Sequence, residues 1–199
     1  MIILGMTGSI GMGKSTTAEM FRTEGIPVHD SDAAVHNLYR GKAAPLIEAE
    51  FPGTVTDGSV DRSRLGSIVI GNSAAMRKLE SIVHPLVAED RDIFLNEARE
   101  IGAPLVVFDV PLLYETGGDK LCDKVLVVTA SADVQRQRVL ARPGMTVEKL
   151  EAILASQMPD AEKRRRADFL VDTGMGMPAA SATVRWIVAR LCGGRQMSE

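Results

Sequence analysis

The chain has 199 residues, 45% of them hydrophobic and 25% charged, with a formal net charge of -3, which is typical of a globular protein that buries a core. The slight acidic balance gives no support for nucleic-acid binding, and two cysteines without metal-ligand spacing argue against a zinc site or a disulfide framework. Since we find neither a signal peptide nor a membrane-length apolar run, we expect a cytoplasmic protein with no membrane partner.

The first predicted strand, 2–6, runs into a glycine-rich stretch that fits G-x-x-x-x-G-K-[ST], Gly8-Ser-Ile-Gly-Met-Gly-Lys-Ser15. Glycines let several backbone N–H groups point into one concavity that suits a phosphate chain, and the helix expected next adds its positive end. Lys14 can reach the outer phosphates, and the Ser15 hydroxyl can hold Mg²⁺. We therefore predict a P-loop that binds a nucleoside triphosphate with Mg²⁺. Its expected nucleotide-binding residues are Gly11, Met12 (through its backbone), Gly13, Lys14, Ser15 and Thr16.

Four more short apolar runs predict strands, at 26–29, 105–109, 124–129 and 169–172. Most are continuously apolar and β-branched, as are strands that are buried on both faces. Because helical patterns lie between them, we predict an α/β fold of the P-loop NTPase type: a five-stranded parallel sheet in a three-layer α/β/α arrangement.

Two segments are too long to be simple crossovers. Residues 31–103 show amphipathic helical patterns and a turn at Asp57-Gly58, which predicts a helical insertion for a second substrate. Residues 132–161 are rich in Arg and Gln and are a candidate lid over the nucleotide. The nucleotide-binding core is then expected at 1–30, 104–131 and 162–192.

Asp30 and Asp32 follow the second predicted strand, where ligands gather in parallel sheets. One carboxylate could accept the proton of an attacking hydroxyl, as a kinase base does. The alternative is that both cap a helix beginning at Ala33, a role for which Asp32 is well placed. Asp109 ends the third strand as a Walker-B carboxylate does, supporting Mg²⁺ directly or through water, or else it caps a turn.

Arg138 and Arg142 have the i, i+4 spacing of one helical face within the candidate lid. Guanidinium groups that reach a phosphoryl-transfer site stabilise the charge on its oxygens, whereas a solvated charged face is the other interpretation. We favour the first for Arg138 and expect Arg136 to face solvent. The basic cluster 163–166 lies beside acidic residues and looks local.

Several segments, in this order and spacing, resemble the dephospho-coenzyme A kinase family over nearly the whole length. Besides the P-loop they are Asp30-Ser-Asp32, Asp57-Gly-Ser-Val-Asp-Arg62, Leu79-Glu-Ser-Ile-Val-His-Pro85, Asp109-Val-Pro-Leu-Leu-Tyr-Glu115, Arg138 with Arg142, Gln157 and Ala167-Asp168. The resemblance implies that ATP phosphorylates the ribose 3′-hydroxyl of dephospho-CoA, giving CoA and ADP, the last step of coenzyme A biosynthesis. It also implies a nucleotide-binding core, a helical CoA-binding domain and a lid.

The resemblance further implies residue roles. Asp32 matches the base, Arg138 the lid arginine, and Arg142 a residue near the adenine. His84 and the segment Leu113, Tyr114 and Glu115 match the acceptor pocket, where Arg62 can assist.

The last strand departs from the family, because it ends in Thr173 where an asparagine is usual; adenine contacts there must come from the backbone or from Thr173. The alternative function is another P-loop kinase, acting on a nucleoside monophosphate, shikimate or gluconate. A GTPase-like switch would need N-K-x-D and D-x-x-G motifs, and Asp109 is instead followed by Val-Pro-Leu. We expect a monomer or a weak homo-oligomer.

Overall fold

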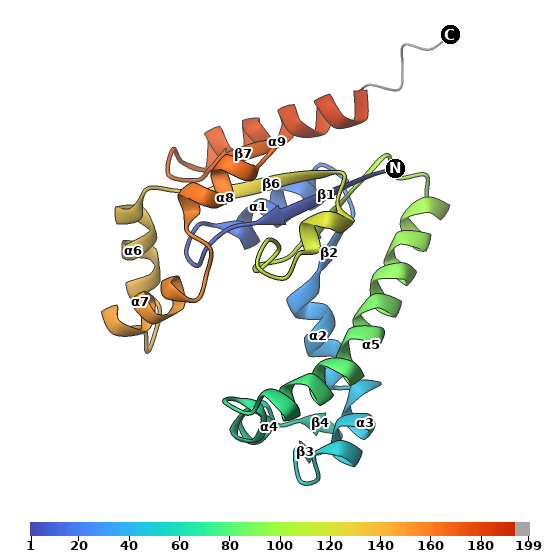
Figure 1. Cartoon of the computed structure of the whole chain (residues 1–199). Helices are drawn as coiled ribbons and strands as arrows, with labels where there is room; N and C mark the ends of the chain where they lie inside the picture. The colour runs from blue at the N-terminus through green and yellow to red at the C-terminus, as the bar shows by residue number, and fades with distance from the viewer. Residues whose placement is uncertain (194–199) are drawn as a thin grey trace. The chain divides into compact units, whose positions relative to one another are not determined.

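The computed structural model describes residues 1–193 (Figure 1). The chain divides into two compact units: Met1–His29 with the chain from Ala98 onward, and Asp30–Glu97. Within residues 1–193, no helix is both long enough and apolar enough to cross a membrane.

The first unit is built on a five-stranded sheet whose order is β2 (Val28–Asp30), β5 (Leu105–Asp109), β1 (Ile2–Thr7), β6 (Lys124–Thr129) and β7 (Phe169–Asp172). β1 pairs in parallel with β5, Met6 opposite Asp109, and with β6. β6 pairs in parallel with β7. All five predicted strands are present, but the second begins at Val28 and not at Ile26. β1, β5 and β6 are largely buried, which explains their continuous apolar runs, whereas the edge strands β2 and β7 are partly exposed.

Helices α1 (Lys14–Thr23) and α9 (Met177–Cys192) pack against one another and against the sheet, and α9 lies alongside β7 in Figure 1. α8 (Asp160–Arg166) packs against β6, after α6 (Ala132–Leu140) and α7 (Val147–Ala155). A short 3₁₀ turn, Gly118–Leu121, precedes β6. The three-layer α/β/α arrangement is confirmed. Its core includes Leu4, Phe21, Leu126, Val171, Val184 and Ile187.

The second unit contains α2 (Ser31–Tyr39), α3 (Ala43–Glu50), α4 (Arg62–Val69) and most of α5 (Ser73–Glu100). It has a hydrophobic cluster of its own, which includes Leu38, Ile47, Phe51, Leu65, Leu79 and Val83. The predicted turn at Asp57-Gly58 joins two short strands, β3 (Val55–Thr56) and β4 (Ser59–Val60), into a hairpin. Both turn residues have positive φ, 51° and 74°, which is why Asp-Gly suits this hairpin.

Removing core volume from α9 should destabilise the first unit strongly. Ile187 is fully buried, so we expect Ile187→Ala to lower the free energy of unfolding by about 2–5 kcal/mol through lost burial and a residual cavity. The matched change Ile101→Ala removes the same atoms from a side chain that is 73% exposed, and should alter stability by no more than about 0.5 kcal/mol. Urea titration of both variants measures the difference; equal losses would contradict this packing of α9.

Candidate active site

The phosphate loop curls between β1 and α1 through two residues with left-handed backbone. Gly11 and Gly13 have φ values of 78° and 93°, which glycine alone adopts without strain. A Cβ at Gly11 would lie 2.5 Å from Cγ2 of Val139, so space as well as conformation requires glycine there. Gly13 is the N-cap of α1, and the loop therefore ends at the positive pole of that helix.

Lys14 and Asp109 meet beside this loop. The Lys14 Nζ lies 2.5 Å from Oδ1 of Asp109, whose side chain is only 2% exposed. The sheet register produces this contact, because β5 ends at Asp109 directly beside β1. Ser15, one residue further on, is exposed. The exposed hydroxyl and the adjacent carboxylate are hard oxygen donors of the kind that Mg²⁺ prefers, so this residue set fits the metal that accompanies ATP.

Arg138 lies over the same loop. Its Nη2 donates to the carbonyl oxygen of Thr173 at 2.9 Å, and its Nη1 donates to Oγ1 of Thr173 at 2.7 Å and to the carbonyl oxygen of Gly11 at 3.5 Å. A cavity of about 340 Å³ is lined by these residues together with Thr16, Arg142 and Met177. The expected shared helical face of Arg138 and Arg142 is wrong, because α6 ends at Leu140. Arg142 instead follows in a turn and still borders the cavity. Arg136 is exposed, as predicted.

Side chains from distant segments hold the backbone of the phosphate loop. Gln135 donates through Nε2 to the carbonyl oxygen of Ile10 at 2.8 Å, and the Ile10 N–H donates to Oε1 of Gln157 at 3.2 Å. The hydroxyl of Thr173 donates to the carbonyl oxygen of Met12 at 2.7 Å. The sequence did not single out Gln135, which is one residue in an Arg- and Gln-rich run. Only the tertiary structure shows that its side chain is buried on α6.

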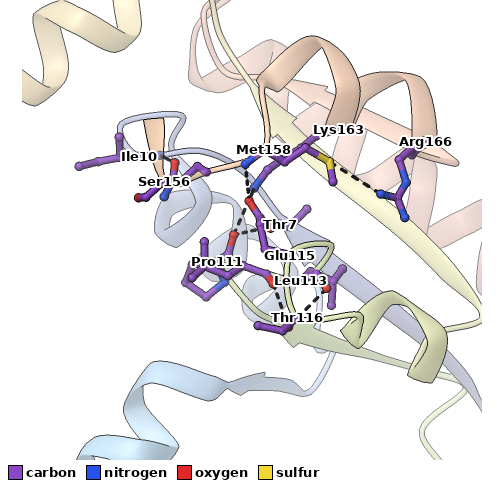
Figure 2. Close-up of polar contacts among 12 residues, drawn as sticks. Thr7, Ile10, Pro111, Leu113, Glu115, Thr116, Ser156, Met158, Lys163 and Arg166 are labelled. Carbon is purple, nitrogen blue, oxygen red and sulfur yellow. Dashed lines mark hydrogen bonds and ion pairs between the residues drawn. The ribbon is translucent and has the colours of Figure 1, made fainter. Parts of the chain in front are cut away.

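The segment predicted to line the acceptor pocket is largely buried. Leu113 and Tyr114 pack against β6, and the guanidinium of Arg166 lies 4.2 Å from the centre of the Tyr114 ring. Figure 2 shows that Glu115 points to the segment before α8, where its Oε1 accepts from the N–H of Met158 at 2.8 Å. The same oxygen is 2.9 Å from Nζ of Lys163, which is fully buried.

Lys163 was missed as an individual residue because it opens the cluster 163–166, which looked like a local basic patch. It also donates to the carbonyl oxygen of Pro111 at 3.4 Å, and Thr7 donates to the same oxygen at 2.9 Å (Figure 2). Burial opposes ionisation of Glu115, but hydrogen bonds from Lys163, from the Met158 N–H and from its own backbone outweigh it and hold the pKa of that carboxyl below its usual range.

In the second unit Asp30, the last residue of β2, and Asp32 have different surroundings. α2 begins at Ser31, not at Ala33, and Asp30 is its N-cap, with Oδ1 accepting from the N–H of Ala33 at 3.0 Å. The expectation that Asp32 suits the cap is therefore wrong: Asp32 lies in the first turn of the helix and is exposed.

The other predicted acceptor residues of this unit lie on helices. His84 is exposed near the middle of α5, followed by Pro85. Arg62 begins α4, and its guanidinium lies 5.3 Å from the centre of the Tyr39 ring. Burial raises the pKa of Tyr39, and the charge of Arg62 opposes that rise. Arg62 and Tyr39 border a cleft of about 260 Å³ whose other walls include Leu65, Val69 and Ile70.

Two solved structures of kinases share this architecture. A shikimate kinase from Acinetobacter baumannii matches over 98% of this chain and 96% of its own, with a TM-score of 0.51 and 18% identity. A dephospho-CoA kinase from Campylobacter jejuni matches over 98% of both chains, with a TM-score of 0.72 and 23% identity. These likenesses show that the chain has the fold of the P-loop kinases.

The family follows from the sequence comparisons. The dephospho-CoA kinase family model matches residues 2–178. The dephospho-CoA kinase of Mesorhizobium japonicum is 64% identical over 195 residues, which cover 98% of this chain and 99% of the relative. The chain belongs to the dephospho-CoA kinase family, whose members use ATP to phosphorylate dephospho-CoA in the last step of coenzyme A biosynthesis. The predicted resemblance is confirmed, and family membership decides against the other small-molecule kinases.

Breaking the buried ion pair should destabilise the first unit. We expect Glu115→Gln, which leaves the Lys163 ammonium buried without its countercharge, to lower the free energy of unfolding by about 3–5 kcal/mol. Glu89→Gln removes the partner of Lys42 from an exposed pair and should cost no more than about 1 kcal/mol. Urea unfolding at neutral pH compares the two.

The difference in free energy of unfolding between wild type and Glu115→Gln should also depend on pH. Because the pKa of Glu115 is lowered in the folded state, the advantage of wild type over Glu115→Gln should be complete above the ordinary carboxyl pKa of about 4.3. It should shrink as the pH falls through the lower folded-state pKa. An advantage that grew on acidification would contradict the ion pair.

Proposed function

We propose that the protein transfers the γ-phosphoryl group of ATP to the ribose 3′-hydroxyl of dephospho-CoA with Lys14, Arg138 and Asp32 as its catalytic residues. The observation that carries this proposal is the grouping of Lys14, Asp109 and Arg138 around one phosphate loop. Phosphoryl transfer depends mainly on positioning and on neutralising charge, which is what two cations beside a helix N-terminus supply. The expected ATP-binding residues are Gly11 to Thr16 with Arg142.

On the acceptor side we assign the base to Asp32. Asp30 is occupied as a helix cap, whereas the Asp32 carboxylate is exposed and is not needed for capping. A carboxylate in hydrogen-bond reach of the hydroxyl would accept its proton as the oxygen attacks phosphorus. Family resemblance supports the same choice.

We assign acceptor binding to Arg62, His84 and the segment Leu113, Tyr114 and Glu115. The cleft between Arg62 and Ile70 supports part of this, since apolar walls beside one guanidinium suit a ligand with uncharged and anionic parts. Leu113 and Tyr114 are buried, so we expect them to shape the pocket through packing and Glu115 to hold that segment through Lys163.

We propose that Mg²⁺ is held by the Ser15 hydroxyl and, directly or through water, by Asp109. Bound with ATP, the metal would supply positive charge to the phosphates. Lys14, which contacts Asp109 in this structure, would then contact the phosphates. The domain limits, the cytoplasmic location and the monomeric or weakly associating state stay predictions, as does the lack of a nucleic-acid partner.

Replacing the proposed base should separate chemistry from nucleotide binding. We expect Asp32→Asn to lower kcat by about 10²- to 10⁴-fold, because an amide cannot accept the proton, while the dissociation constant of ATP stays nearly unchanged. Coupled ADP release with dephospho-CoA measures kcat, and calorimetry measures ATP binding.

Asp30→Ser is the matched control, since serine retains a side-chain acceptor for the helix cap. Near wild-type kcat is expected. If the serine variant were as inactive as Asp32→Asn, the division of roles between the two aspartates would be refuted. Preferred turnover of shikimate, gluconate or a nucleoside monophosphate over dephospho-CoA would overturn the proposed acceptor.

The dependence of turnover on Mg²⁺ tests the assignment of Ser15 to the metal site. Chelation of divalent cations should abolish turnover, and Ser15→Ala should raise the Mg²⁺ concentration for half-maximal activity by roughly tenfold or more. Ser67→Ala removes an exposed hydroxyl that donates only within its own helix turn and should leave the Mg²⁺ titration unchanged. An unaltered titration for Ser15→Ala would remove that residue from the metal site.

A further inference from the structure

Thr173 lies where three parts of the nucleotide site meet. It directly follows β7, and its N–H donates to the carbonyl oxygen of Thr129 at the end of β6, 2.9 Å away. Its hydroxyl donates to the carbonyl oxygen of Met12 in the phosphate loop, a residue 161 positions earlier in the chain. Arg138 of α6 donates to the hydroxyl oxygen and to the carbonyl oxygen of the same threonine.

The single hydroxyl of Thr173 links the guanidinium of Arg138 to the carbonyl group of Met12. A hydroxyl has one proton to donate and two lone pairs to accept with. In Thr173 the proton goes to Met12 at 2.7 Å, and one lone pair accepts from Nη1 of Arg138, also at 2.7 Å. The position of the guanidinium is therefore coupled to the position of the loop backbone.

The methyl group of Thr173 fills the space that the phosphate loop leaves open. Gly13 has no side chain, and a Cβ built there would lie 3.1 Å from both Cγ2 and Oγ1 of Thr173. Packing against the glycine fixes the rotamer of Thr173, and so the direction in which its hydroxyl points. The bidentate contact then restricts Arg138, a long side chain that otherwise samples many rotamers.

We propose that Thr173 is a positioning residue for phosphoryl transfer, which holds the Arg138 guanidinium in register with the Met12 carbonyl of the phosphate loop before ATP binds. It acts through Arg138, because its hydroxyl donates to the loop and accepts from the guanidinium at the same time. Preorganised charge raises the rate because it need not be ordered during the reaction. The inference rests on the proposed role of Arg138.

A double-mutant cycle tests this coupling. Thr173→Val preserves the shape and removes the hydroxyl, Thr173→Ser keeps the hydroxyl, and each is combined with Arg138→Ala. With Arg138 present, we expect Thr173→Val to lower kcat about tenfold, as loss of a hydrogen bond to a charged group does, with the KM for dephospho-CoA unchanged. Thr173→Ser should stay within about threefold of wild type.

In the Arg138→Ala background, Thr173→Val should change kcat by less than about twofold, because the group through which Thr173 acts is gone. Equal losses in both backgrounds would mean that Thr173 acts only by supporting the loop, and would overturn the inference. A changed preference between ATP and GTP without a change in kcat would instead indicate direct base contact and would also overturn it.

Two further results keep the test decisive. If Arg138→Ala alone retained wild-type kcat, the proposed function of Arg138 would fail, which is distinct from a failure of the Thr173 coupling. Urea midpoints verify that each variant is folded. Should the valine variant not fold, Thr173→Ala removes the same hydroxyl without adding bulk beside Gly13, and the same pattern is expected of it.

Discussion

Parallel pairing of β1 with β5 and β6 sets the geometry on which the rest of the nucleotide site depends. The register places Met6 beside Asp109, so the end of β5 and the start of the phosphate loop leave the sheet at the same edge. Lys14, the first residue of α1, reaches Asp109 across that edge. The ion pair joins the loop to the neighbouring strand in a place where the carboxylate is almost fully buried, and a buried carboxylate requires such a partner.

The loop is then held from outside by side chains of later segments. Gln135 and Thr173 bond to its carbonyl groups, and Gln157 accepts from one of its N–H groups. Contacts of this kind fix a backbone that contains left-handed glycines and would otherwise be mobile. Phosphoryl transfer demands such rigidity, because a small displacement of the γ-phosphate or of a cation costs much of the rate.

The Glu115–Lys163 pair joins the segment from Leu113 to Glu115 to α8. Burying two charges costs desolvation energy, and good geometry with added hydrogen bonds is needed to offset it. Glu115 receives both the Lys163 ammonium and the Met158 N–H, and Lys163 also reaches Pro111. Removing either partner would leave the other charge buried without its countercharge.

Much of this protein was determined by the sequence alone. The strands, the phosphate loop and the Asp57-Gly58 hairpin follow from local patterns, since apolar runs, glycine and Asp-Gly each restrict the backbone of their own few residues. Local patterns also identified Lys14 and Asp109 as candidate site residues. Lys14 belongs to the phosphate-loop motif, and Asp109 ends a strand of a parallel sheet, whose carboxyl ends meet at one edge. Only the tertiary structure decided that Asp30 is the helix cap, that Glu115 pairs with Lys163, and that Thr173 joins Arg138 to the phosphate loop. The choice of Asp30 as cap depends on the residue at which α2 begins, which a sequence pattern does not fix to within two residues. The other contacts join residues 35 to 161 positions apart, so they depend on how whole elements pack and not on any local pattern.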